Sequence, residues 1–406
     1  MRQMASDIKK VTKLFYLQQF TSNCIVIYPF YAIMFSERSG LSTAEISALF
    51  GWWILVALLS ELPTGTLADK FSRRSVIILS NVMQATAFAM WLIMPSFIGY
   101  GIGFLLWGIG FALNSGAFQA CVYDELKSHG QAHIFTKVLG RITSMRLVGM
   151  LVAFLIATLI GPNYPIALVV SILISLSSSY VAFLFPKAPK IPPEQRQKIS
   201  QISLLKDAII EVSRSKLLIR LVITLSIAIA ISSVMAEYVP LYDKMVGVPV
   251  PFIPLILTVD LAIGAALSWI AHRFESRTRL FGLLCLVLAG AALLITSYGD
   301  TITAVLGMFV FMELVELSSL LYQSSLQHHI SGASRATIGS LPTFIAEALS
   351  VAIVATYGIV SRYFGDFASI RMMAAMTLLA GVILFWFWKN HQLKIAAPAQ
   401  LQNDII

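Results

Sequence analysis

The chain has 406 residues, of which 58% are hydrophobic and only 12% are charged, and its mean hydropathy is +0.81. Soluble domains carry about 25% charged residues, so this composition excludes an ordinary water-soluble domain. The net charge of +9 comes from bases dispersed over many short segments, which does not favour a nucleic-acid-binding patch. We therefore predict an all-α membrane protein embedded in a lipid bilayer.

Apolar blocks of about 20 residues follow one another along the chain, and as helices they match the ~30 Å hydrocarbon layer of a membrane. Short segments rich in Gly, Pro and polar residues separate them. Residues 1–13 are polar and basic, so no cleavable signal peptide is predicted. Twelve membrane-spanning helices are predicted, at residues 14–36, 42–68, 75–94, 97–122, 137–160, 164–185, 217–242, 251–271, 279–297, 301–326, 337–361 and 368–389.

The basic residues predict the orientation of these helices. If the N-terminus is inside, the loops on the other side hold only Arg38, Lys244, Arg362 and Arg371, and the remaining bases gather on the inner side. Because cytoplasmic loops favour Lys and Arg, both termini are predicted to be cytoplasmic. The expected location is a multi-pass protein of the cell membrane, with a bacterial inner membrane favoured.

The longest polar interruption divides the chain. After the Pro-rich, basic PKAPKIPPEQRQK, the segment ISLLKDAIIEVSRSK places an apolar stripe at helical spacing. An amphipathic helix at the inner membrane surface is predicted, with the stripe at Leu204, Leu205, Ala208, Ile209 and Val212. We therefore predict three parts: an N-terminal six-helix bundle (1–186), a cytoplasmic linker (187–216) and a C-terminal six-helix bundle (217–406).

The two halves share a weak internal repeat, which reads LADKFSRR at 67–74 and IAHRFESR at 270–277. Two pseudo-symmetric halves with a binding site between them near the midplane are typical of secondary transporters.

The segment ELPTGTLADKFSRR (61–74) resembles the signature of the major facilitator superfamily, with Ser72 in place of its second glycine. The matching positions are Gly65, Asp69, Arg73 and Arg74. The resemblance implies the twelve-helix fold of that superfamily, in which this element locks the cytoplasmic face in one of two states. We expect a monomer without a cofactor. Glu61 lies two helical turns before Asp69 and is expected to support this gate.

Two further stretches resemble a drug-exporter-like branch of the same superfamily. They are SGAFQACVYDELKSHG (115–130), which contains Asp124 and is followed by Gly140 and Arg141, and SRATIGSL (334–341). By this resemblance Asp124 and Arg141 are expected to belong to the conformational switch.

Ionisable residues at membrane depth are the next candidates, because each costs at least ~2.5–3.5 kcal/mol to insert. The acids are Glu61, Glu237, Asp260, Glu313, Glu316 and Glu347, and Arg146 is the basic candidate. Burial favours the neutral form of a carboxyl group, so such an acid suits the carriage of protons. Proton coupling is expected at Asp260, Glu313, Glu316 or Glu347, and Glu237 and Arg146 are candidates for the cavity. Alternatively, some of these acids pair with Arg146 or with hydroxyls and only fix helix packing.

In the first half, amides and aromatic rings suggest a cavity for an amphipathic organic molecule. The residues concerned are Gln19, Asn23, Tyr28 and Tyr31. Ordinary interhelical hydrogen bonds and aromatic belts are the alternative interpretation. The adjacent His328 and His329 point in different directions on a helix, so no metal site is predicted.

These features predict a secondary transporter that exports an amphipathic small molecule by alternating access, driven by protons. A transporter of a specific metabolite, such as a siderophore, is the alternative, and Arg146 would then meet an anionic group. A membrane-embedded enzyme or a sensor is disfavoured, because no nucleotide loop or nucleophile–base arrangement occurs and no loop exceeds about thirty residues.

Overall fold

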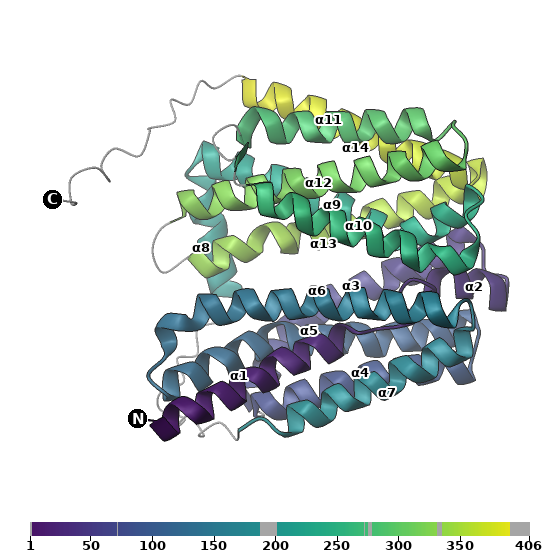
Figure 1. The fold of residues 1–406 in the computed structure, drawn as a ribbon. Coiled ribbons are helices and arrows are strands. Elements are labelled where there is room, and N and C mark those ends of the chain that lie inside the picture. The colour runs from purple at the N-terminus through teal and green to yellow at the C-terminus, as the bar shows by residue number, and fades with distance from the viewer. Residues whose placement is uncertain are drawn as a thin grey trace.

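The computed structural model describes the chain except for residues 1, 71, 187–200, 272, 275–277, 331–334 and 390–406. The described residues form long α-helices joined by short connections (Figure 1). The first helices are α1 (Arg2–Asn23), α2 (Tyr31–Ser39), α3 (Thr43–Lys70), α4 (Arg73–Ile93), α5 (Phe97–Ser128), α6 (Phe135–Ile160) and α7 (Tyr164–Phe183). They are followed by α8 (Gln201–Ser213), α9 (Lys216–Met245), α10 (Ile253–Ile270), α11 (Thr278–Thr296), α12 (Thr301–His329), α13 (Arg335–Phe364) and α14 (Asp366–Lys389).

Ten of the helices in the described part of the chain are long and apolar enough to cross a membrane. A shorter apolar helix covers Leu280–Thr296. The prediction of an all-α, multi-pass membrane protein is thus confirmed. The count of twelve stays a prediction, because the first predicted span is divided between α1 and α2 and the ninth is short.

Side-chain caps begin several helices where loops were predicted. Ser96 accepts a hydrogen bond from the amide of Gly99, Asn163 from that of Ile166, and Asp300 from that of Thr303. Each cap satisfies an amide that has no partner inside its own helix. Short polar side chains between apolar blocks therefore set these helix starts directly.

The break between α1 and α2 differs from the continuous helix predicted at 14–36. Pro29 lies in the break, and proline both lacks an amide hydrogen and clashes with the carbonyl four residues earlier. The freed amide of Ile27 instead donates to Oγ of Ser171 on α7, at 3.0 Å. Irregular backbone at membrane depth is tolerated only where neighbouring groups satisfy it in this way.

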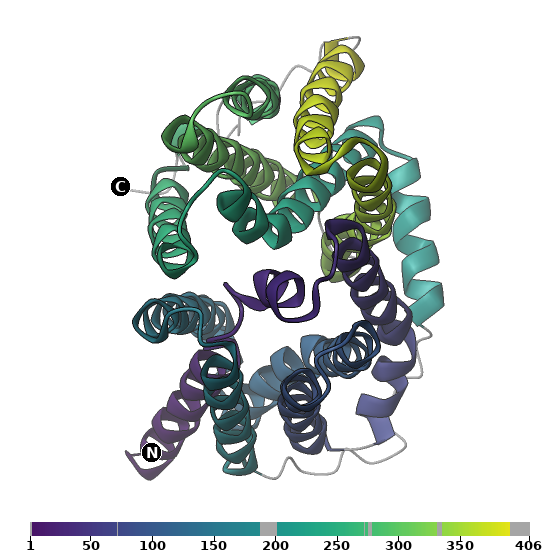
Figure 2. The same ribbon diagram turned by 90° about the vertical axis from the view of Figure 1, so that its right-hand side faces the viewer.

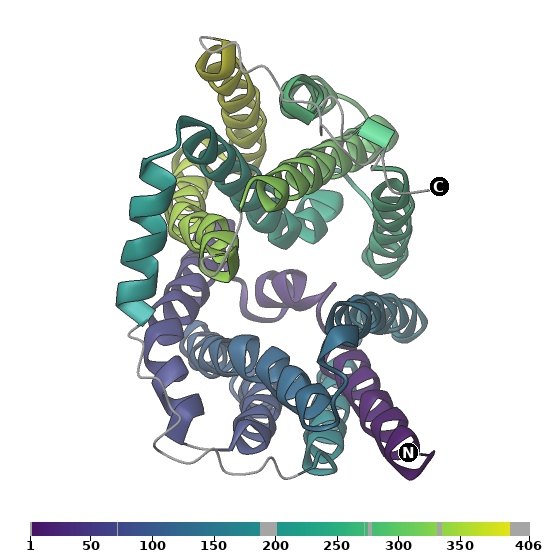
Figure 3. The same ribbon diagram turned by 90° about the vertical axis from the view of Figure 1, so that its left-hand side faces the viewer.

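The helices form two groups. Helices α1 and α3–α7 pack against one another, as do α9–α14. Helix α2 follows α1 in the chain and packs against α3, so we count it with the first group. The groups meet where α3 packs against α13, α6 against α10 and α2 against α9 (Figure 2). Helix α2 lies at one end of the molecule, and α8 lies at the other with the start of α1 (Figures 1 and 3). We call these the α2 end and the α8 end.

The helix predicted in the linker is present as α8, which packs against α9 and α13. Ala208 and Val212 are buried there, whereas Ile209 is half exposed. The side chains of Leu204 and Leu205 lie outside the described residues.

Candidate functional site

A carboxylate on α9 is held by two tyrosines from the other group of helices. The hydroxyl of Tyr28 donates to Oε1 of Glu237 at 2.9 Å, and the hydroxyl of Tyr31 donates to Oε2. Within the described part of the chain, Glu237 has no basic partner. Both of its oxygens therefore depend on phenolic hydroxyls that belong to the opposite group.

The break between α1 and α2 positions these tyrosines. Tyr28 lies in the non-helical segment just before Pro29, and Tyr31 is the first residue of α2. In an unbroken helix, Tyr28 and Tyr31 would lie on one face of a helix that continues in the same direction beyond them. Here the turn brings both hydroxyls to one carboxyl group. We call Glu237, Tyr28 and Tyr31 the tyrosine clasp.

Aromatic rings support the clasp from the side of α3–α6. The ring of Tyr31 stacks on Trp91 with centroids 5.7 Å apart, and that of Tyr28 stacks on Phe154 at 6.3 Å. Trp107 contacts both tyrosines edge to face, at 6.5 and 6.3 Å. Such contacts fix the two tyrosine rings next to the carboxylate of Glu237.

Further polar contacts join the two groups at the α2 end. Tyr238, next to Glu237, donates to Oγ of Ser47 on α3 at 2.7 Å, and its ring stacks on Tyr357 of α13 at 3.8 Å. Gly358 allows α13 to approach α3, because a Cβ atom there would lie 2.8 Å from Cβ of Ser47. These contacts close the α2 end around the clasp.

The outermost of these contacts is an ion pair. Lys244 of α9 lies 2.7 Å from Glu37 of α2, and the hydroxyl of Tyr164 donates to the same carboxylate. Partial burial by itself raises the pKa of Glu37, but the hydrogen bonds from Lys244 and Tyr164 and the charge of Lys244 outweigh it. The pKa of Glu37 consequently lies below its ordinary value of 4.5.

The predicted acids of the second half form a separate acidic group between α10 and α12. Glu313 is nearly buried, and its carboxylate lies against Gly264, where an added Cβ would be 3.1 Å from Oε1. Asp260 is four residues before Gly264 and so shares its face of α10, and one of its oxygens is buried without a hydrogen-bond partner. Glu316 is more exposed and accepts a hydrogen bond from Ser232 at 3.3 Å. The charges of Asp260 and Glu316 both act on Glu313.

Of the remaining candidates at membrane depth, Glu347 and Glu61 lie near each other, and Arg146 lies apart from them. Glu347 of α13 has a buried oxygen without a hydrogen-bond partner, and the charge that acts on it is that of Glu61 on α3. Arg146 is exposed on α6 and is in none of the ion pairs found in the described chain. The alternative in which Arg146 neutralises an acid therefore has no support in this structure.

The predicted amides serve their own helix. The side chain of Gln19 donates to that of Gln18 at 3.1 Å, and Asn23 donates to the carbonyl of Gln19 at 2.9 Å. Asn23 is the last residue of α1, so its bond supports the helix end before the break. The structure thus brings Tyr28 and Tyr31 to Glu237, but not these two amides.

The predicted gate lies towards the α8 end. Arg73, at the start of α4, pairs with Asp124 of α5 and also donates to the carbonyl of Ala120 at 2.5 Å. Arg74 donates to the carbonyl of Phe185 at 2.9 Å. Both arginines therefore bind within the first group of helices.

Three gate residues have no described contact. Helix α3 continues through Gly65 and Asp69, but the side chains of 62–70 lie outside the described residues. Arg141 is exposed on α6.

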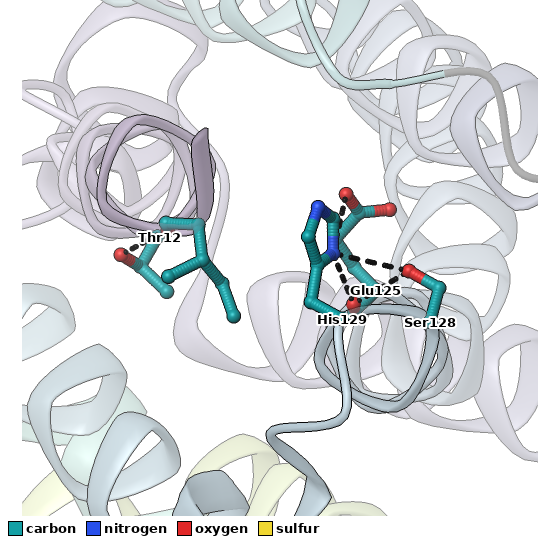
Figure 4. A network of polar contacts seen from close by, with 5 residues as sticks. Thr12, Glu125, Ser128 and His129 are labelled. Atoms are coloured by element: carbon teal, nitrogen blue, oxygen red, sulfur yellow. Dashed lines mark hydrogen bonds and ion pairs between the residues drawn. The ribbon is translucent and has the colours of Figure 1, made fainter. Parts of the chain in front are cut away.

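A second polar network ends α5 near the same place (Figure 4). The ring of His129 lies 3.6 Å from the carboxylate of Glu125, and its Nδ1 lies 2.9 Å from the carbonyl of the same residue. Ser128 also donates to that carbonyl, at 2.8 Å. The network is local to one helix end, so it fixes the helix end without joining the two groups.

The sequence profile of the Major Facilitator Superfamily matches residues 14–355. The chain belongs to the major facilitator superfamily. Its structure is similar to that of the nucleoside transporter NupG, with a TM-score of 0.76 and 14% identity, over 93% of this chain and 99% of that one. No curated protein sequence matches the chain.

Two other solved structures are similar as well. A bacterial homolog of the human lysosomal transporter Spinster, in an inward-facing and unoccupied conformation, has a TM-score of 0.74 and 16% identity over 96% of this chain and 97% of that one. A D-xylose-proton symporter has a TM-score of 0.69 and 16% identity over 94% and 98%. At these identities the likeness shows the fold alone. Together with the family, it makes this protein a transporter and not an enzyme.

Some residues of this major facilitator site were missed from the sequence. Asp243 is 1% exposed in the last turn of α9, at the α2 end, and neither carboxylate oxygen has a hydrogen-bond partner in the described part of the chain. Glu37 and Lys244 were not expected to meet. An acid–base pair next to the predicted outer ends of two spans was the available signal, but the sequence does not show which spans are neighbours.

Proposed function

We propose that this major facilitator protein moves an amphipathic small organic molecule across the cell membrane by alternating access, in exchange for protons, and that Glu237 couples the two movements. The observation that carries the proposal is the tyrosine clasp. Among the described residues, both hydrogen bonds to this carboxylate at membrane depth come from the opposite group of helices. Any motion that separates the groups at the α2 end must therefore leave Glu237 without donors.

A proton is the simplest replacement for those donors. An ionised carboxylate at membrane depth is costly without partners, whereas the neutral acid costs much less. Opening the α2 end thus favours protonation of Glu237, and closing it returns the two tyrosine hydroxyls and favours release of the proton. A cationic or hydrogen-bond-donating group of a substrate can take the same place, so substrate and proton compete for one carboxylate. That competition produces exchange.

The proposed topology follows from the fold. Helices α1 and α2 together make the first span and α11 the ninth, giving twelve spans in bundles of residues 1–186 and 217–406 joined by the linker 187–216. The grouping of the helices supports this division. The distribution of Lys and Arg supports a cytoplasmic α8 end, with both termini in the cytoplasm. The α2 end is then external, and its closed contacts are those of an inward-facing state. We propose export as the direction of transport, in exchange for protons that enter. We expect a monomer.

The test uses purified protein in liposomes. A thermal-shift screen of amphipathic cations first identifies a ligand, because a ligand that binds the folded state raises its unfolding temperature. Uptake of that ligand is then driven by an imposed pH gradient. Glu237→Gln should abolish accumulation against the ligand's gradient while equilibration down the gradient continues, since a permanently neutral site still allows the helices to move.

Glu316→Gln is the matched control, because Glu316 is an acid at membrane depth outside the clasp. It should retain accumulation. If Glu237→Gln still accumulates ligand and Glu316→Gln does not, the coupling site belongs to the acidic group on α10 and α12. If both accumulate ligand, protons are not coupled through either site.

A further inference from the structure

An apolar groove lies on the surface of the second group of helices, between α9 and α14. Its volume is about 490 Å³, and its walls include Ile223, Ile227, Leu379, Ile383, Trp386 and Phe387. Several of these side chains are well exposed, among them Ile383 at 62% and Trp386 at 66%. Large apolar side chains exposed on a membrane helix face the lipid chains, so the groove opens towards hydrocarbon.

An arginine lies at the end of this groove nearest the start of α9. Arg220 is only 7% exposed, and its Nε and Nη1 atoms are buried without a hydrogen-bond partner. Its guanidinium carbon lies 5.0 Å from the ring centroid of Phe387, a groove residue. Arg220, Ile223 and Ile227 are three and four residues apart and therefore share one face of α9.

Trp388, the residue after Phe387, links α14 to α9. The guanidinium carbon of Arg220 lies 5.9 Å from the ring centroid of Trp388 on α14. The indole of Trp388 donates to Oγ1 of Thr224 on α9, at 3.2 Å. The arginine thus lies against two rings of α14, of which Trp388 is fixed by this hydrogen bond, and its Nε and Nη1 donors have no partner among the described residues.

A buried guanidinium without an anionic partner is costly. No carboxylate in the described part of the chain pairs with Arg220. Guanidinium groups bind phosphate through two parallel hydrogen bonds, and an apolar groove opening to hydrocarbon accepts an acyl chain. A phosphate joined to an acyl chain is a phospholipid. Basic pockets between membrane helices on the cytoplasmic side are also where anionic headgroups bind.

We propose that the groove between α9 and α14 binds one anionic phospholipid, with an acyl chain along Ile223, Ile227 and Ile383 and the phosphate on Arg220. The start of α9 lies at the α8 end, so the lipid comes from the leaflet on that side. The site is independent of the tyrosine clasp, which lies towards the other end of α9.

The test uses the full-length protein, purified in detergent and stripped of lipid. Dioleoyl phosphatidylglycerol, dioleoyl phosphatidylcholine and glycerophosphoglycerol, the headgroup without chains, are added separately. Unfolding temperature and native mass spectra measure binding. Phosphatidylglycerol should bind and raise the unfolding temperature more than phosphatidylcholine, and the chainless headgroup should have no effect.

Variants locate the site. Arg220→Gln should weaken the affinity for phosphatidylglycerol by roughly tenfold to hundredfold, because hydrogen bonds to a charged group are lost. Arg214→Gln, an exposed arginine near the same end, should bind as the wild type does. Ile383→Trp should fill the groove and reduce binding with Arg220 intact, so it decides the matter if Arg220→Gln fails to fold.

Equal binding of phosphatidylglycerol by the wild type and both groove variants would overturn the proposal. An effect of glycerophosphoglycerol equal to that of the lipid would also overturn it, since the site would then bind a free phosphate group and no acyl chain.

Discussion

The two ends of the molecule use polar side chains differently. At the α2 end, Glu37, Ser47, Glu237 and Tyr238 each have a partner in the opposite group of helices. Towards the α8 end, Arg73 and Asp124 bind each other within one group. The described contacts at the α2 end therefore exist only while the groups are together, whereas the Arg73–Asp124 pair survives their separation. A barrier that opens must be built of the first kind of contact.

The largest expected effect is on the tyrosine clasp. Removing both hydroxyls with the double variant Tyr28→Phe/Tyr31→Phe keeps the ring packing but takes two charge-assisted donors from Glu237. Each is worth ~1.5–3 kcal/mol, so the closed α2 end should lose at least about tenfold in population. Spin labels at Ile98→Cys and Phe252→Cys, which are exposed on the two groups at that end, should show a longer distance. The native cysteines are buried, which confines labelling to this pair.

Tyr180→Phe is the control for that measurement. Tyr180 is 64% exposed on α7, so this substitution removes a hydroxyl far from Glu237. Its distance distribution should equal that of the wild type. Identical distributions for all three proteins would show that the clasp does not hold the end closed.

The next effect concerns the approach of α3 and α13. Gly358→Val places a branched side chain where even a Cβ atom would be 2.8 Å from Cβ of Ser47. Overpacking of this kind costs ~1–3 kcal/mol, and here separation of the groups relieves it. The same label pair should lengthen. Gly116→Val tests the opposite case, because a Cβ atom there meets nothing within 4 Å, and it should leave the distance unchanged.

Breaking the Arg73–Asp124 pair, towards the α8 end, should lower the stability of the fold and leave the α2 end closed. The side chains of Arg73 and Asp124 are 27% and 33% exposed, so Asp124→Asn should lower the unfolding free energy by about 1 kcal/mol. Thermal unfolding measures that loss, and Arg141→Gln, which alters an exposed arginine, should cause none. The distance between the labels at the α2 end should stay at its wild-type value. A change as large as that of the tyrosine variant would remove the distinction between the ends.

The smallest effect is a pH dependence of the Glu37–Lys244 ion pair. Because the pKa of Glu37 lies below 4.5 in the closed structure, the pair stabilises that structure above the ordinary pKa, and the contribution is lost as pH falls through the lowered value. An exposed pair contributes ~0.2–1 kcal/mol, so acidification from pH 7 to pH 4 should shift the label distance slightly towards the open form. Glu37→Gln should remove this component. A wild-type shift that persists unchanged in Glu37→Gln would assign it to another acid.

The sequence alone determined the architecture, and the tertiary structure decided the site. Some features are local in the sequence and could be predicted from it: the lengths of the apolar helices, caps such as Ser96 and Asn163, and the family signature. Pro29 was visible too, but whether a proline breaks a membrane helix depends on a neighbour that satisfies the freed backbone, here Ser171. Tyr31 and Glu237 were separate candidates 206 positions apart. Their meeting depends on how α2 packs against α9, and many weak apolar contacts spread over both groups set that packing, without any short motif to encode it.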